Sequence, residues 1–140
     1  MEPVLTGGCQ CGAVRYALYA MPERTSLCHC RMCQKAVGQP FAAYTCVPAD
    51  KFAWTRGKPP TFRSSTAAER HFCPACGIYT HHRRRSNPNE YGVNAACLEG
   101  VSPFDFAEVP VYDGITHPND RPKRPGYEIA GVLRYEPRTG

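Results

Sequence analysis

Apolar and polar residues alternate along two stretches of the chain, and this period of two is typical of half-buried strands. In residues 13–19, Val14, Tyr16 and Leu18 share one face. Residues 41–47 alternate in the same way. Shorter extended segments are predicted at residues 52–55, 70–72, 78–82, 91–96 and 109–112. The pattern therefore predicts many short strands.

Turn-forming residues separate these segments. Gly, Pro, Asn and Asp gather at residues 7–8, 48–50, 57–60, 86–89 and 113–114, where they favour chain reversal. Strands and turns at this spacing predict an antiparallel all-β domain. One short helix is predicted over residues 31–37, and Gly38 is placed to end it in a left-handed conformation.

The last part of the chain is less regular. No repeat or low-complexity linker divides the first hundred residues, so we predict one domain over residues 1–114. An irregular extension over residues 115–140 is expected to pack on the same domain. Residues 115–125 are polar and Pro-rich, which predicts a surface excursion. Residues 132–135 suit either a last strand or a draped segment.

Composition supports a single turn-rich domain. The 140 residues are 42% hydrophobic and include 14 Pro and 12 Gly, and a chain of this length can bury one core. No stretch approaches the ~20 apolar residues of a membrane helix. Residues 1–8 lack the basic start and apolar run of a secretory signal. We therefore expect a cytoplasmic protein with no membrane partner.

The chain has nine cysteines, an odd number that favours metal ligation or redox chemistry over a disulfide framework in a reducing compartment. Seven of them form three clusters, which read Cys9-Gln-Cys11, Cys28-His-Cys30-Arg-Met-Cys33 and Cys73-Pro-Ala-Cys76-Gly77. A C-x-x-C turn followed by Gly brings two sulfurs within about 2.3 Å of one Zn²⁺. The clusters divide naturally into four thiolates plus three. Four close a structural site, whereas three leave a position open.

Two alternatives remain open for the cluster of three. A fourth ligand from His29, His71 or Cys46 would turn it into a second closed site. The C-x-x-C spacing of Cys30 and Cys33 also permits a redox dithiol, although the βαβ context of a thioredoxin-like motif is absent. The two remaining thiols, Cys46 and Cys97, stand in apolar segments and are predicted to lie in the core.

The charge pattern gives little support to a nucleic-acid partner. The formal charge of +5 counts every thiol as neutral, and two loaded zinc sites would lower it to about +2. The Arg run at residues 83–85 has no array of aromatic residues beside it, so a solvated loop is expected. His81 and His82 are adjacent in an extended segment, and therefore point to opposite faces.

The three clusters resemble a known family. The segments that carry the resemblance are Gly8-Cys9-Gln-Cys11-Gly12-Ala-Val14-Arg15-Tyr16, Cys28-His29-Cys30-Arg-Met-Cys33-Gln-Lys and Arg70-His-Phe72-Cys73-Pro-Ala-Cys76-Gly77. In order and spacing they are similar to the glutathione-dependent formaldehyde-activating enzymes, a family that includes centromere protein V. The match covers roughly residues 5–100.

The resemblance implies a β-tent fold of packed antiparallel sheets held by zinc, with little helix. It also implies two Zn²⁺ per chain, with Cys9, Cys11, Cys73 and Cys76 as structural ligands and Cys28, Cys30 and Cys33 as catalytic ligands. The implied activity is carbon–sulfur lyase chemistry, the formation of S-(hydroxymethyl)glutathione from glutathione and formaldehyde. A small thiol such as glutathione is therefore the expected partner.

The match to the family is weaker beside the substrate. Residues 78–82 and 111–124 depart from the family pattern. Nearness to the ligands, and charge suited to a carboxylate-bearing thiol, select five candidate substrate contacts. They are His29, Lys35, Ser64, Ser65 and Arg70. The alternative function is a non-catalytic thiol carrier or interaction module whose zinc ions only hold the fold.

Overall fold

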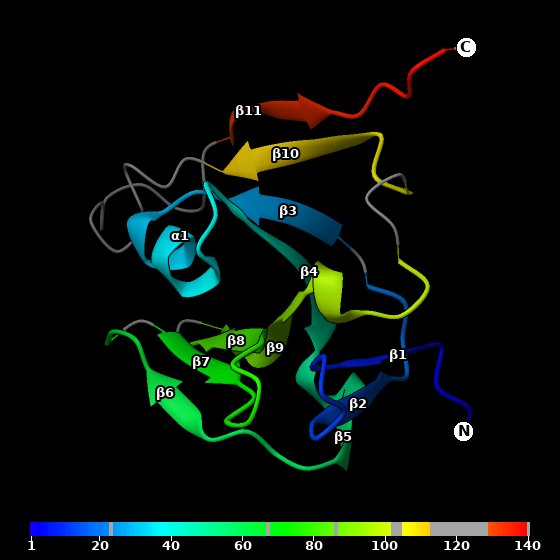
Figure 1. The fold of residues 1–140 in the computed structure, drawn as a ribbon, viewed down its shortest axis with the longest axis vertical. Helices are drawn as coiled ribbons and strands as arrows, with labels where there is room; N and C mark the ends of the chain where they lie inside the picture. Colours follow the sequence, from blue (N-terminus) through cyan, green and yellow to red (C-terminus); the bar gives the residue numbers. More distant parts are fainter. Residues whose placement is uncertain (23, 67, 86, 102–104, 113–128, 140) are drawn as a thin grey trace.

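A computed structural model describes residues 1–22, 24–66, 68–85, 87–101, 105–112 and 129–139. Its strands form two sheets (Figure 1), which agrees with the predicted mainly β class. The small sheet has the order β1-β2-β5 and the large one the order β11-β10-β3-β4-β9-β8-β7-β6. The strands are β1 (Leu5–Gly8), β2 (Arg15–Leu18), β3 (Arg24–Cys28), β4 (Ala42–Pro48), β5 (Phe52–Arg56), β6 (Thr61–Arg63), β7 (Ala68–Phe72), β8 (Tyr79–Arg84), β9 (Asn87–Asn94), β10 (Glu108–Tyr112) and β11 (Ile129–Arg134).

All seven predicted extended segments overlap strands, but the pattern missed β1, β3 and β6. These three lack clear alternation and gain their extended conformation by pairing with neighbours. The turn predicted at residues 86–89 was wrong in part, because β9 begins at Asn87. The fully antiparallel expectation also needs one correction. Strand β10 pairs with β3 in parallel, while all other neighbouring strands are antiparallel.

The C-terminal segment contains a regular strand. Residues 132–134, for which a strand and a draped segment were both open, belong to β11, which pairs antiparallel with β10. The part of the extension that the structure describes is therefore more regular than predicted. The surface excursion expected at residues 115–125 lies outside the described residues.

The main core lies between the two sheets. Tyr16 and Leu18 from β2 pack with Val47 from β4 and Val93 from β9, and all four are fully buried. This confirms the predicted buried face of residues 13–19, although Ala17 on the other face is buried as well. Burying a large apolar side chain contributes roughly 1.5–3 kcal/mol. The small sheet is therefore held firmly against the middle of the large one.

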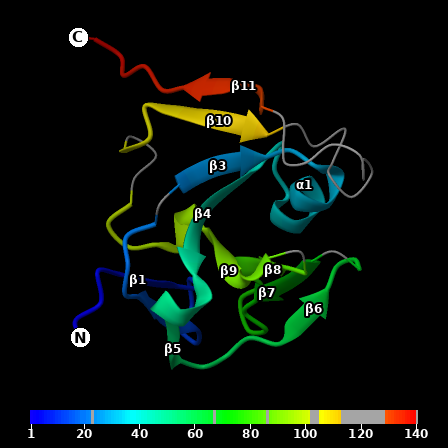
Figure 2. The same ribbon diagram turned by 180° about the vertical axis from the view of Figure 1, so that it is seen from behind.

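Helix α1 (Arg31–Val37) has the predicted bounds and directly follows β3. The Gly38 N–H donates to Gln34 O at 2.8 Å, with a Gly38 φ of 66° that closes the helix. Figures 1 and 2 show α1 beside the large sheet, between the end formed by β3 and β10 and the end formed by β6 and β7. The two short 3₁₀ turns are η1 (Ala49–Lys51) and η2 (Ala95–Cys97). No described helix is long and apolar enough to cross a membrane.

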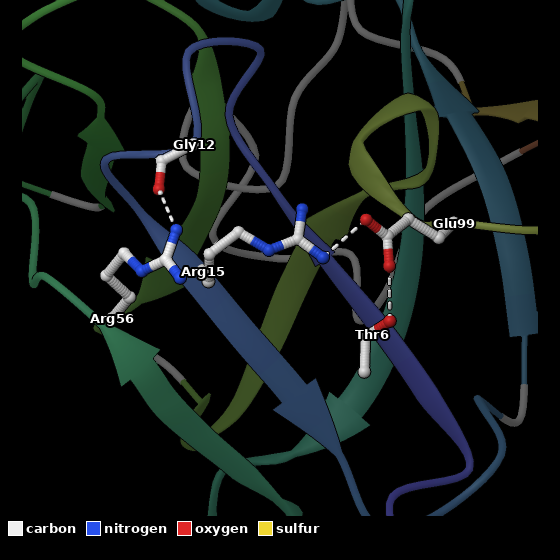
Figure 3. Close-up of polar contacts among 5 residues, drawn as sticks. All are labelled: Thr6, Gly12, Arg15, Arg56 and Glu99. Atoms are coloured by element: carbon white, nitrogen blue, oxygen red, sulfur yellow. Dashed lines mark hydrogen bonds and ion pairs between the residues drawn. The ribbon is translucent and has the colours of Figure 1, made fainter.

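Polar contacts hold the loop between β1 and β2 in place (Figure 3). The Arg15 guanidinium from β2 and the Thr6 hydroxyl from β1 both donate to the Glu99 carboxylate. These donors hold the pKa of Glu99 below its usual range. On the other side, Arg56 Nη1 donates to the Gly12 carbonyl at 3.2 Å. The loop that carries the first cysteine pair is thereby tied to β5 and to the segment after η2.

Candidate metal centres

The first and third cysteine clusters meet in space. The Sγ atoms of Cys9, Cys11, Cys73 and Cys76 all lie within 4.8 Å of one another. Cys9 and Cys11 stand in the loop between β1 and β2, and Cys73 and Cys76 in the turn between β7 and β8. The cluster therefore joins the small sheet to the large one.

The sulfur spacing suits a tetrahedral zinc. Four sulfurs at about 2.3 Å from one Zn²⁺ lie about 3.8 Å apart. Here Cys9 Sγ is 3.5 Å from Cys11 Sγ, and Cys11 Sγ is 3.7 Å from Cys73 Sγ. Four thiolates are also a donor set that zinc prefers. By spacing and chemistry, this cluster fits a closed zinc site.

Backbone N–H groups are turned toward these sulfurs. The Val14 N–H donates to Cys9 Sγ at 3.3 Å and the Cys76 N–H to Cys73 Sγ at 3.5 Å. Gly77, with φ of 79°, permits the turn, and its N–H donates to Cys73 O at 2.8 Å. Backbone N–H groups, chiefly that of Cys11, lower the pKa of the Cys76 thiol to about 6. The local backbone thus favours the thiolate form that metal binding needs.

The middle cluster is built where β3 gives way to α1. Cys28 ends β3, Cys30 caps α1 by accepting the Cys33 N–H at 3.3 Å, and Cys33 lies in the first helical turn. Their three Sγ atoms also lie within 4.8 Å of one another. None of His29, His71 and Cys46 belongs to this group, and no other described His, Cys, Asp or Glu joins it. Among the described residues, the cluster therefore offers three sulfurs to a metal ion.

Cys33 also accepts hydrogen bonds from two buried side chains across the cluster. Arg70 Nη2 and the Tyr44 hydroxyl each donate to Cys33 Sγ at 3.5 Å. Arg70 Nη1 donates to the hydroxyls of Tyr44 at 3.2 Å and Tyr79 at 2.9 Å, and Arg70 Nε to Ser64 Oγ at 3.0 Å. Arg70 is only 5% exposed. A buried cation is therefore directed at one sulfur of the cluster.

These contacts favour a charged sulfur at Cys33. The hydrogen bonds from the Cys28 and Cys30 thiols lower the pKa of Cys33 most, and the Arg70 charge and the Tyr44 hydroxyl lower it further. Hydrogen bonding with Cys30 and Cys33, together with burial, raises the pKa of Cys28. Burial and the hydrogen bonds among the three thiols thus raise the pKa of Cys28 and of Cys30 while the pKa of Cys33 falls. A divalent cation would let all three act as thiolates.

A pocket of about 420 Å³ opens beside the middle cluster. Arg70, which donates to Cys33, is part of its wall, as is Tyr79, which accepts a hydrogen bond from Arg70. Its described lining consists of Met32, Lys35, Ala36, Phe62, Ser64, Arg70, Phe72, Gly77 and Tyr79. The wall is mainly apolar and includes one lysine, and small-molecule sites have this size and character.

Three of the five candidate substrate contacts, Lys35, Ser64 and Arg70, line this pocket. His29 and Ser65 are not among its described lining residues, and Ser65 lines a different pocket. Sequence reasoning missed Tyr44 and Tyr79. Their presence in predicted strands was a usable signal, because a buried tyrosine hydroxyl usually needs a hydrogen-bond partner. The sequence did not show that the partner would be Arg70.

The other cysteines and the histidines lie outside the two clusters. Half-buried Cys97 packs against the core between the two sheets, which agrees with the prediction. Half-buried Cys46 belongs to no described core cluster, so the prediction for Cys46 was wrong. Cys46 stands opposite exposed Arg24 at the start of the neighbouring strand β3, which leaves its side chain half-buried. His81 packs on Trp54 and other aromatic rings. His82 packs on Tyr44 with ring centroids 4.3 Å apart, which confirms that His81 and His82 face opposite ways.

Comparison with known proteins identifies a family. Residues 4–109 match the family described as glutathione-dependent formaldehyde-activating enzyme. An uncharacterized lyase of Schizosaccharomyces pombe is 30% identical over 106 residues, which cover 74% of this chain and 75% of the relative. The crystal structure of a Rhodobacter sphaeroides protein aligns with a TM-score of 0.64 and 40% identity, over 76% of this chain and 98% of that one. The chain is therefore a member of the glutathione-dependent formaldehyde-activating enzyme family.

Proposed function

We propose that this protein is a zinc-dependent carbon–sulfur lyase-type enzyme that forms or breaks an adduct between a small thiol and an aldehyde. By family membership the reference reaction is S-(hydroxymethyl)glutathione formation from glutathione and formaldehyde. The observation that carries the proposal is the three-cysteine cluster beside a pocket with an apolar wall and a lysine. Its relationship to a protein named as a lyase agrees with this class.

Two zinc ions per chain are part of the proposal. Cys9, Cys11, Cys73 and Cys76 would hold a structural zinc, and Cys28, Cys30 and Cys33 a zinc with an open position. The contrast between the closed and the open donor sets supports this division, because three protein ligands leave room for a substrate atom. When bound there, zinc would supply a positive charge that lowers the pKa of the substrate thiol.

The residues around the pocket have separate roles in the proposed reaction. Lys35 attracts the anionic end of the thiol, because it stands in the pocket wall. Arg70 already donates to Ser64, Tyr44, Tyr79 and Cys33, so four of its five N–H groups have partners. It therefore acts on the cluster and leaves the substrate carboxylate to Lys35.

The apolar side of the pocket keeps water away from the reacting atoms. Met32, Phe62 and Phe72 line this side, and Phe62 and Phe72 pack with ring centroids 6.2 Å apart. In the forward direction the thiol sulfur attacks the carbonyl carbon, a C–S bond forms and the C=O π bond breaks. The proton released by the thiol ends on the new hydroxyl oxygen. Held together, the two reactants gain from proximity.

The first test measures metal content and rate together. The purified protein should hold about two zinc per chain, and should speed hydroxymethyl-thiol formation above the uncatalysed background. Lys35→Ala should raise KM for a carboxylate-bearing thiol, with Lys51→Ala as the matched control. A zinc-loaded protein that neither binds small thiols nor changes this rate would refute the proposal.

The second test separates the enzyme from the non-catalytic alternative. Cys30→Ser should abolish catalysis while circular dichroism shows a folded protein. Cys76→Ser should unfold the chain, because it opens the site that joins the two sheets. If Cys30→Ser unfolds as completely as Cys76→Ser, both sites are structural. The thiol carrier or interaction module would then be the better description.

A further inference from the structure

A second pocket lies away from the middle cluster, on β6, β7 and the end of β8. Its volume is about 340 Å³, and four arginines contribute to its wall. They are Arg63 from β6, Arg83 and Arg84 at the end of β8, and Arg85 directly after it. We call it the arginine pocket. Its remaining described lining residues are Ser65, Thr66, Ala68, Glu69 and Pro88.

Strand register explains why these arginines converge. Arg63, Glu69 and Arg83 stand directly opposite one another on β6, β7 and β8, and opposed residues on antiparallel strands share a face. The pairing of β8 with β9 shifts register between Arg83 and Arg84. Such an irregularity re-aims side chains, and both of these consecutive arginines line the pocket.

The same strands carry two different faces. Phe62, Arg70 and His82 are opposed in the next register row, and Arg70 points to the cysteine cluster. Because successive residues of a strand face opposite ways, the row of Arg63, Glu69 and Arg83 belongs to the other face. The arginine pocket also reaches Ala68 and Arg84 at the end of the strands, and it shares no described lining residue with the pocket beside the middle cluster.

The charges that line the arginine pocket are unbalanced. Four arginines line the pocket, and Glu69 supplies the one carboxylate among its described lining residues. Glu69 Oε1 lies 3.5 Å from Arg63 Nη2, and the side chain of Arg63 is 81% exposed. Arg85 Nη1 donates to the Thr66 carbonyl at 3.5 Å. Like charges gathered in a concave site raise the local potential, so an incoming anion would relieve their repulsion.

We propose that the arginine pocket binds a small ligand with a diphosphate group. Guanidinium groups match phosphate oxygens in geometry and charge, and several phosphate oxygens could engage several arginines together. The pocket volume suits a small molecule. Its described lining contains no aromatic side chain for base stacking, which favours a small phosphate ligand over single-stranded nucleic acid. The proposed site is distinct from the pocket of the thiol chemistry, because the two share no described lining residue.

The test is calorimetric titration of the zinc-loaded full chain with inorganic pyrophosphate. One site per chain is expected, with affinity that falls as salt rises. The double variant Arg83→Gln with Arg84→Gln should weaken binding at least tenfold. Arg134→Gln is the matched control, because Arg134 lies in β11 at the opposite edge of the large sheet. It should leave the affinity unchanged.

A substitution expected to act in the opposite direction sharpens the test. Glu69→Gln removes the competing carboxylate and should tighten pyrophosphate binding several-fold. Pyrophosphate could also release heat by removing zinc from the protein, and that heat would be the same in every variant. Unchanged heat in the double variant would therefore overturn the proposal. No saturable binding at millimolar pyrophosphate, or equal weakening by Arg134→Gln, would also overturn it. If a single-stranded oligonucleotide binds more tightly and displaces pyrophosphate, the pocket binds nucleic acid and the small-ligand proposal is wrong.

Discussion

Replacing Arg70 by Met should weaken zinc binding at the middle cluster much more than at the four-cysteine cluster. Arg70 is 5% exposed and its Nη2 donates to Cys33 Sγ at 3.5 Å. A three-thiolate zinc site carries a charge of about −1, and the Arg70 guanidinium offsets it inside the protein. Methionine keeps much of the volume, but removes both the charge and the donors.

The magnitude follows from the burial of the pair. Removing one partner of a buried charge pair costs about 3–5 kcal/mol. The Tyr44 and Tyr79 hydroxyls remain bonded to each other at 3.0 Å, so the lower end of that range applies. Since each 1.4 kcal/mol is a factor of ten, zinc affinity at the middle cluster should fall about a hundredfold.

The assay is competition with a chromophoric chelator, which resolves tight and weak zinc in the same sample. The four-cysteine cluster is the internal control and should keep its zinc. Arg70→Lys retains the charge without the planar fork, and should lie between wild type and Arg70→Met. Arg63→Met removes an exposed arginine from the neighbouring strand and should leave the zinc affinity of both clusters unchanged. A folded Arg70→Met protein that holds both zinc ions as tightly as wild type would refute the reasoning.

Three further substitutions test the packing around the site. Burial lowers the pKa of His81 to about 2. Below about pH 6.5 the His81 imidazole therefore takes up a proton only in the unfolded chain. The free energy of unfolding falls as the pH falls below this value. His81→Phe should reduce the loss in unfolding free energy between pH 7 and 5 by about 2 kcal/mol, and equal losses in both proteins would contradict this. The Tyr16 hydroxyl is buried with no partner among the described residues; Tyr16→Phe should therefore leave stability in urea unchanged or raise it by about 1 kcal/mol, and a clear loss would show a missing partner. A Cβ at Gly92 would lie 2.2 Å from the His82 ring, so Gly92→Ala should cost about 1–3 kcal/mol. Gly131→Ala, which meets nothing within 4 Å, is its control, and equal effects would refute the clash.

Much of the local structure could be predicted from the sequence. The alternation of Val14, Tyr16 and Leu18 predicted a buried strand face, and Gly38 predicted the end of α1. Both signals are local, because strand pleat and helix capping depend on neighbours a few residues apart. Strands β1, β3 and β6 had no such signal. Their conformation depends on partners elsewhere in the chain, as does the parallel pairing of β10 with β3.

The candidate metal sites were predicted through ligand chemistry and family resemblance. Seven cysteines in three clusters indicated four ligands plus three, and the structure groups the sulfurs in that way. Spacing could not say which clusters pair, because a contact between residues 11 and 73 depends on how the sheets pack. Spacing likewise left open whether a fourth ligand completes the middle cluster, and His29, His71 and Cys46 all lie outside it.

By itself, the sequence determined the candidate residues: the three cysteine clusters and the cation Lys35, with the arginine run at residues 83–85 expected only as a solvated loop. Only the tertiary structure decided what those residues face. Arg70, chosen as a substrate contact, is directed at Cys33 and two tyrosines, and the arginine run joins Arg63 in one pocket. The physical reason is register. A residue's place in a strand sets its face, but pairing with other strands sets its neighbours, and those pairings span residues far apart in the chain.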